Sequence, residues 1–83
     1  MEKIIIHLEV PAIEQEYDVF VPVFLTVAEA TELLIHAVLD LSGNNYHVSG
    51  GEVLCLKERD LILEKSRELQ TYGIQNGDIV VMI

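Results

Sequence analysis

Cysteine is nearly absent from this 83-residue sequence, which contains only Cys55 and has no tryptophan. A lone cysteine cannot form a disulfide within the chain, so side-chain packing must hold the fold together without covalent help. One cysteine also cannot supply the four thiolates of an iron–sulfur cluster. This cysteine usage fits a reducing compartment.

Basic residues are scarce as well, with five lysines and arginines against fourteen acidic residues and a net charge of −9. Such a chain repels a phosphate backbone or an anionic lipid surface, which argues against nucleic acid as a partner. No apolar run approaches the roughly 18 residues that would span a bilayer, and the N-terminal stretch MEKIII does not resemble a signal peptide. We therefore expect a cytoplasmic protein, without direct membrane insertion, that reaches a membrane only through a protein partner.

Hydrophobic residues make up 51% of the chain, slightly above the roughly 45 to 50% that is usual for globular domains. A chain of this length supports one core and little else. We predict a single domain over residues 1–83, with part of its apolar surface available to a partner.

Alternating hydrophobic residues predict two paired strands near the N-terminus. Every second residue from Ile4 to Val10 is apolar, and Pro11 is expected to end this first strand. Residues 17–23 alternate in the same way and predict a second strand paired back on the first. Ile5 and Phe20 are the apolar residues that would point outward from this pair.

A helix is predicted to begin near Val27. Thr26 and Glu29 have the spacing of a capping box, in which each side chain binds the backbone N–H of the other residue. Gly43 supplies the left-handed residue that commonly closes a helix. The predicted core stripe of this helix is Ala30, Leu34, Ala37, Val38 and Leu41.

A second apolar strip, consisting of Ala28, Ile35 and Leu39, falls opposite that stripe at 100° per residue. A row of exposed apolar residues is typical of contact with a partner or with a second copy. The alternative is a shifted helix register, or packing of Leu39 under the loop 44–51. The candidate partner-binding residues are Ile5, Phe20, Ile35 and Leu39.

The second half of the chain predicts short elements separated by turns. Residues 53–56 and 61–63 indicate two short strands, residues 69–72 a single helical turn, and Asn76-Gly77 a tight turn into a last strand. One helix covers only one face of a sheet, so we predict an α+β fold with the helix packed across one face of a mixed sheet of five or four strands.

No catalytic or metal-binding pattern stands out. Cys55 lies in the apolar run VLCL and is expected to be a small core residue rather than a nucleophile. The histidines His7, His36 and His47 lack the spacing of a zinc site and are expected at the surface. We expect no enzymatic activity, no cofactor and no metal.

The segment from Leu69 to Val80, with the pattern L-x-x-Y-G-I-x-x-G-D-x-V, resembles the stretch that precedes the last strand of ubiquitin-like β-grasp proteins. The N-terminal stretch VPAIEQEYDVFVP resembles the small YukD or EsaB type of ubiquitin-like protein associated with bacterial type VII secretion. The resemblance implies a β-grasp fold and an accessory or regulatory role, with a membrane ATPase or another membrane subunit of the secretion machine as partner.

Ubiquitin-like modifiers and sulfur carriers act through a flexible C-terminal Gly-Gly, whereas this sequence ends in the strand-forming residues Val80 to Ile83. Its Gly50-Gly51 pair lies in the middle of the chain and is expected in a loop. We therefore predict a non-enzymatic module that binds proteins non-covalently. The alternatives are a self-associating scaffold that forms a homo-oligomer and, less favoured, a modifier or sulfur carrier.

Overall fold

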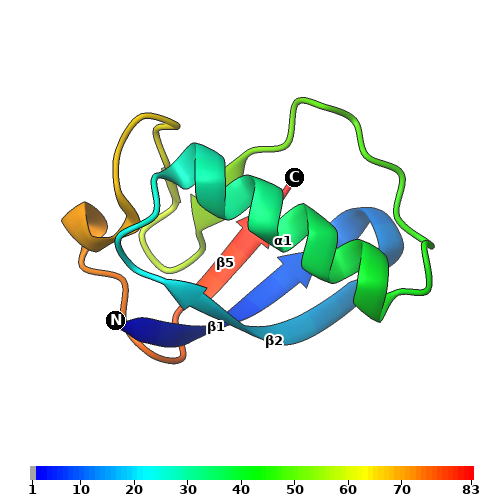
Figure 1. Ribbon diagram of the computed structural model, residues 1–83, viewed down its shortest axis with the longest axis horizontal. Coiled ribbons are helices and arrows are strands. Elements are labelled where there is room, and N and C mark those ends of the chain that lie inside the picture. The colour runs from blue at the N-terminus through cyan, green and yellow to red at the C-terminus, as the bar shows by residue number, and fades with distance from the viewer. Residues whose placement is uncertain (1) are drawn as a thin grey trace.

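The computed structural model describes residues 2–83, which form a five-stranded sheet crossed by one long helix (Figure 1). The elements in chain order are β1 (Lys3–Val10), the 3-10 turn η1 (Pro11–Ile13), β2 (Gln15–Pro22), α1 (Val27–Leu41), β3 (Leu54–Leu56), β4 (Leu61–Ile62), the 3-10 turn η2 (Leu69–Tyr72) and β5 (Ile79–Met82). Each strand and helix predicted from the sequence is present, with small differences at the ends.

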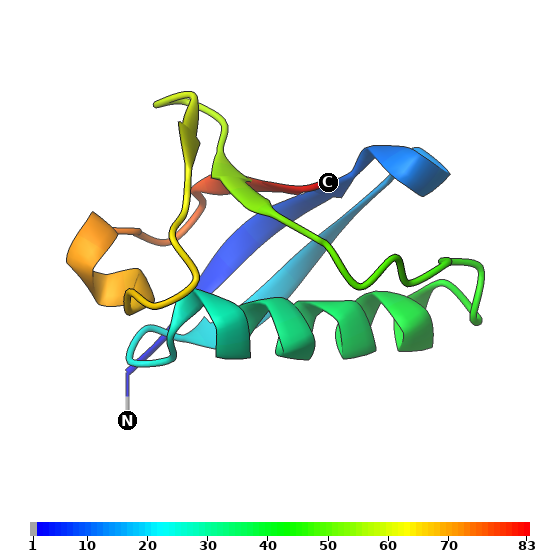
Figure 2. The ribbon, with the colours of Figure 1, turned by 90° about the horizontal axis from the view of Figure 1, so that it is seen from above.

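The strands lie in the order β2-β1-β5-β3-β4. Strands β1 and β5 are parallel, while the β1–β2, β3–β5 and β3–β4 pairs are antiparallel, so the sheet is mixed. Figure 2 shows α1 lying across one side of the sheet, with no second helical layer on the opposite side of the described chain. The predicted α+β arrangement is confirmed, and the sheet has five strands rather than four.

Strands β1 and β2 pair along their whole length, from Lys3 opposite Pro22 to Val10 opposite Gln15. Burial alternates along β1 as expected, because successive side chains point to opposite faces of a strand. Ile6, Leu8 and Val10 lie in the core at 3%, 0% and 0% exposure. The first strand ends at Val10, directly before Pro11, as the sequence predicts.

The capping box of α1 is formed. The backbone N–H of Glu29 donates to Thr26 Oγ1 at 3.1 Å, and the backbone N–H of Thr26 donates to Glu29 Oε1 at 2.9 Å. The helix closes through Ser42 and then Gly43, whose φ of +64° is left-handed. Both helix ends therefore follow from local sequence signals.

The predicted core stripe of α1 is rotated relative to the observed one. Leu41 was expected in the core and is 57% exposed, whereas Ile35 was expected at the surface and is only 6% exposed. The observed buried residues start one turn earlier and are Val27, Ala30, Thr31, Leu34, Ile35 and Val38.

A buried threonine explains why the sequence pattern misplaced this stripe. Thr31 is buried in the middle of the stripe because its hydroxyl donates to the Val27 carbonyl oxygen at 2.7 Å and also accepts from Lys65 Nζ at 3.3 Å. A hydroxyl satisfied in this way can enter a core. Sequence periodicity treats a threonine as polar and so places the stripe elsewhere.

Among residues 2–83, no helix combines the length and the apolar character that a membrane crossing requires.

Candidate functional site

The uncovered face of the sheet, which lies on the side away from α1, carries two of the predicted partner-binding residues. Ile5 on β1 pairs directly with Phe20 on β2. Phe20 is 64% exposed, and Ile5 is half-buried. The structure therefore brings Ile5 and Phe20 together as one exposed apolar pair.

A second apolar group lies on the same face toward the other edge of the sheet. Val81 on β5 pairs with Cys55 on β3, and Cys55 pairs with Ile62 on β4. Ile79 lies two residues before Val81 on the same side of its strand. We call these four residues, Ile79, Val81, Cys55 and Ile62, the outer patch. Sequence reasoning missed them because only the pairing of distant strands reveals that they adjoin.

The expectation that Cys55 is a core residue is wrong. Its neighbours Leu54 and Leu56 point into the core at 1% and 3% exposure, so Cys55 points to the uncovered face, where it is half-buried. Ile62 beside it is 66% exposed. In a short strand an unbroken apolar run places apolar residues on both faces of the sheet. The run therefore does not show which of its residues point into the core.

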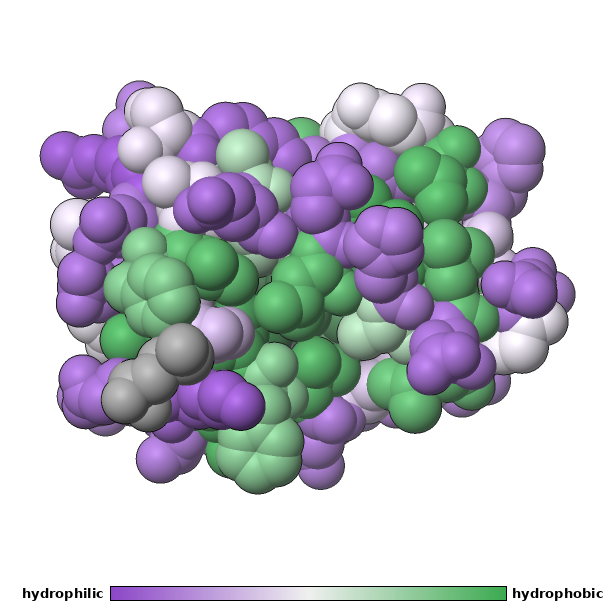
Figure 3. Space-filling model, in the orientation of Figure 1, coloured by the Kyte–Doolittle hydropathy of each residue, from purple (hydrophilic) through white to green (hydrophobic). Residues whose placement is uncertain are grey.

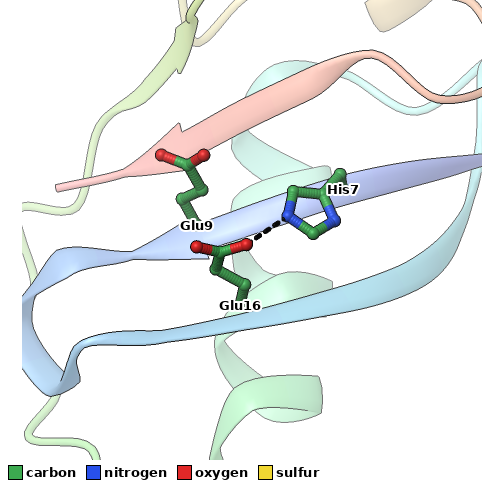
Figure 4. A group of neighbouring side chains, drawn as sticks. All are labelled: His7, Glu9 and Glu16. Atoms are coloured by element: carbon green, nitrogen blue, oxygen red, sulfur yellow. Dashed lines mark hydrogen bonds and ion pairs between the residues drawn. The ribbon is translucent and has the colours of Figure 1, made fainter.

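A polar group occupies the same face between strands β1 and β2. His7 Nε2 lies 2.6 Å from Glu16 Oε1, and His7 Nδ1 lies 3.0 Å from Asp18 Oδ1. Lys57, which follows β3 on the other side of β5, donates from Nζ to both carboxylate oxygens of Glu9, at 3.0 and 3.2 Å. Figure 4 shows His7, Glu9 and Glu16 projecting from the two strands on the side away from the helix.

The two carboxylates change the proton affinity of His7. The hydrogen bond to Asp18, followed by that to Glu16, raises the pKa of the imidazole above its usual value of 6.5, and the partial burial of the ring opposes this only in part. An imidazolium is therefore stabilised between two carboxylates. This feature was not predicted, because the partners of His7 are cross-strand carboxylates and not other histidines.

The other two predicted binding residues, Ile35 and Leu39, do not reach the uncovered sheet face. Ile35 belongs to the core, and Leu39 is half-buried against it. Both line a groove of about 460 Å³ between α1 and the segment 48–53, together with Val48, which is 42% exposed. Figure 3, which faces the helix side, shows hydrophobic side chains between hydrophilic ones on this surface. The predicted helix strip is thus a groove wall rather than a protruding patch.

The segment that forms the other wall of this groove is held by a buried carboxylate. Glu52 is 2% exposed, and it accepts hydrogen bonds from Tyr46 Oη at 2.8 Å and from the Ser49 and Gly50 N–H groups at 2.8 and 3.1 Å. Lys65 Nζ donates to the Glu52 carbonyl oxygen at 2.6 Å and ties the segment to the rest of the fold. Residues 44–51 were predicted as a loop, and the burial of Tyr46 and Glu52 was not predicted.

The pKa values of the Tyr46–Glu52 pair move in opposite directions. Burial disfavours the charged form of Glu52, but the hydrogen bonds from Ser49 and Tyr46 outweigh it and lower the pKa of Glu52 to about 2. Burial, with the hydrogen bond to Glu52 and its charge, raises the pKa of Tyr46 to about 12. At neutral pH the pair therefore consists of a carboxylate and a neutral phenol.

No family model matches this sequence, and no curated protein is significantly similar to it in sequence. Solved structures are nevertheless similar over almost the whole chain. The ubiquitin-like domain of Plasmodium falciparum Dsk2 superposes with a TM-score of 0.75 at 18% identity, covering 98% of this chain and 96% of that one. The EccD5 ubiquitin-like domain from Mycobacterium xenopi superposes with a TM-score of 0.80 at 15% identity, covering 100% and 94%. The protein has the ubiquitin-like β-grasp fold.

The β-grasp fold is not confined to ubiquitin-like domains. A chain of the toluene 4 monooxygenase HD complex with the inhibitor 4-bromobenzoate superposes with a TM-score of 0.81 at 7% identity, covering 98% of this chain and 96% of that one. At such identities the likeness concerns the fold alone, and a fold does not assign a function. The function of this β-grasp chain must be argued from its surface.

The C-terminal signature quoted from the sequence is a set of packing positions in the β-grasp. Leu69, Ile74 and Val80 lie in the core at 4%, 6% and 2% exposure. The hydroxyl of Tyr72 accepts a hydrogen bond from the Glu64 N–H at 2.9 Å, and Gly73 has the left-handed φ of +65°. The signature therefore stabilises the entry into β5.

Proposed function

We propose that this β-grasp chain is a non-enzymatic interaction module that binds a protein partner non-covalently through the uncovered face of its sheet. In this proposal it is a cytoplasmic accessory or regulatory component of a bacterial type VII secretion system. The partner is a membrane ATPase or another membrane subunit of that machine.

The observation that carries the proposal is the amount of apolar surface on a sheet face that no other element of residues 2–83 covers. The Ile5–Phe20 pair lies on β1 and β2, and the outer patch extends over β5, β3 and β4, so all five strands contribute an apolar side chain. Two of these side chains, Phe20 and Ile62, are 64% and 66% exposed. Burying them against a partner is favourable in proportion to the apolar area removed from water.

The charges on the same face define the chemistry of the partner. Glu9, Glu16 and Asp18 lie beside these apolar groups on β1 and β2, and Lys57 is the basic residue that pairs with Glu9. The whole chain carries a net charge of −9. A partner surface with an apolar centre and basic residues around it complements this face, and the charges would speed its association.

The assignment to secretion is supported by two likenesses. The N-terminal stretch resembles the YukD or EsaB type, and a bacterial ubiquitin-like domain, that of EccD5, shares this shape over the whole chain.

The test is affinity capture of the tagged chain from detergent-solubilised cells of its own host, with bound proteins identified by mass spectrometry. Phe20→Asp and Ile62→Asp are compared with Leu41→Asp, a control that places the same charge on an exposed apolar residue of α1. We expect membrane subunits of a secretion machine to be recovered with the control and lost with the two sheet variants.

Three other outcomes would contradict the proposal. Equal capture by the folded Phe20→Asp and Ile62→Asp variants would exclude this face as the interface. Capture of nothing but further copies of the chain would indicate a self-associating scaffold. Recovery of an adenylating enzyme or of covalent adducts would indicate a modifier or sulfur carrier.

A further inference from the structure

Four side chains with metal-ligating atoms form a compact rectangle on the uncovered face. In the β1–β2 pair, His7 is directly opposite Asp18, and Glu9 is directly opposite Glu16. The residues lie two apart on each strand, so all four point to the same side of the sheet. This arrangement is set by the backbone register and does not depend on a flexible loop.

We propose that this rectangle is a surface binding site for a divalent transition-metal ion of the zinc type, held by His7 Nε2 with the carboxylates of Glu16 and Glu9. One potential ligand atom from each of these residues lies within 4.8 Å of the other two (Figure 4). Zinc bound at about 2.0 to 2.2 Å by tetrahedral ligands separates its donor atoms by roughly 3.3 Å. Side-chain shifts of about 1 Å therefore suffice to assemble three ligands, with water completing the shell.

Asp18 contributes by orienting the imidazole. Its carboxylate lies 3.0 Å from His7 Nδ1 and holds a proton on that nitrogen, so Nε2, which faces Glu16, is the nitrogen that a metal would take. A carboxylate bound to the second ring nitrogen is the usual support of a metal-ligating histidine. Because Asp18 holds the proton on Nδ1, loss of the Nε2 proton leaves the tautomer that a metal requires, which a simple cluster of surface acids cannot offer.

The donor set favours a transition metal over calcium or magnesium. Calcium takes six to eight oxygen ligands and magnesium keeps a shell of oxygens, whereas imidazole nitrogen suits zinc, copper and nickel. Two carboxylates opposite each other at Glu9 and Glu16 repel, and a bound dication would remove that repulsion.

Two cations compete with the metal for the same atoms. A proton on His7 Nε2 binds Glu16 in the metal-free protein, and Lys57 Nζ binds both oxygens of Glu9. Metal binding must therefore release a proton from His7 and weaken the Lys57–Glu9 ion pair. The groups facing His7 are Asp18 and Glu16 on β2 and Glu9 on its own strand, with Lys57, directly after β3, reaching Glu9.

Calorimetric titration of the untagged chain with zinc chloride at pH 7.5 tests the site, with NMR detection of the imidazole nitrogens. We expect one ion per chain, with a shift of the Nε2 resonance of His7 and unchanged rings at His36 and His47. His7→Gln should weaken zinc affinity by at least about tenfold, while His36→Gln, an exposed histidine on α1, should leave it unchanged. Lys57→Gln should strengthen binding by freeing Glu9.

Two results would overturn the proposal. One is zinc affinity that is the same in the folded His7→Gln variant as in the original chain. The other is equal binding of calcium or magnesium at the same concentrations, which would mean that a chain of net charge −9 merely attracts cations. Circular dichroism checks separately that the His7→Gln variant is folded.

Discussion

Phe20 and Ile5 face each other across the β1–β2 pair on the side of the sheet that the helix leaves uncovered. Their side chains are close because the two strands pair in register over eight residues each. Apolar residues directly opposite on an exposed sheet face stabilise the strand pair only modestly and are available to a partner.

Phe20 should contribute little to the stability of the free protein. Because it is 64% exposed, Phe20→Ala should change the free energy of unfolding by less than about 0.5 to 1 kcal/mol. Leu8→Ala, at a fully buried position of the neighbouring strand, should cost about 2 to 5 kcal/mol. Urea unfolding of both variants measures the difference, and similar losses in the two would mean that Phe20 packs into the fold.

Ile35 should behave as a core residue. At 6% exposure, Ile35→Ala should lower the free energy of unfolding by about 2 to 5 kcal/mol. Leu41→Ala on the same helix, at 57% exposure, should change it by less than about 0.5 kcal/mol. Thermal unfolding of the two variants checks the observed rotation of α1. A larger loss of stability in Leu41→Ala than in Ile35→Ala would support the core stripe predicted from the sequence. Substitutions at Ile35 are therefore poor probes of partner binding.

Glu52 should stabilise the fold in a pH-dependent way. Its pKa falls from 4.5 to about 2 on folding, so its contribution is complete above pH 4.5 and disappears as the pH falls toward 2. Glu52→Gln should cost about 2 kcal/mol at pH 7 because a buried, hydrogen-bonded charge is lost. Chemical unfolding at several pH values should show that the difference in the free energy of unfolding between Glu52→Gln and the original chain disappears between pH 4.5 and 2. A gap of constant size would contradict a carboxylate role, and Glu58→Gln in an exposed turn is the control.

His7 should stabilise the fold more at low pH than at high pH. Its pKa is raised in the folded state, so the stabilisation is present below pH 6.5 and is lost as the pH rises through the folded pKa. The difference in melting temperature between the original chain and His7→Gln should therefore be larger at pH 5.5 than at pH 8.5. NMR titration of the ring measures the direction of the His7 pKa shift independently. A His7 pKa at or below that of a free histidine would disprove the bridging role.

Local signals allowed much of the fold to be predicted. The Thr26–Glu29 capping box and Gly43 mark the two ends of α1 because they satisfy backbone groups within a few residues of themselves. Alternation predicted β1 with its correct ends, and Gly77, with a φ of +87°, forms the turn expected before β5. Each of these signals acts over a span shorter than one element.

The candidate site could be predicted only in part for the same reason. Ile5 and Phe20 were found because alternation assigns each to the outer face of its own strand. Cys55 and Val81 were not, since their contact depends on the pairing of β3 with β5, which are separated by more than twenty residues of chain. The proposed metal group needs the β1–β2 register, and a one-residue slip would send its side chains to the other face.

The sequence by itself determined the element order, the helix ends, the acidic charge and the α+β class, because these depend on composition and on short-range hydrogen bonding. Only the tertiary structure decided which way α1 is rotated, where Cys55 points and that Glu52 is buried. Thr31 and Glu52 are polar residues that enter the interior because the fold satisfies their hydrogen bonds. Thr31 bonds to Val27 and Lys65, and the carboxylate of Glu52 bonds to Tyr46, Ser49 and Gly50. Burial of a polar group depends on such partners, and a pattern of apolar and polar residues does not record them.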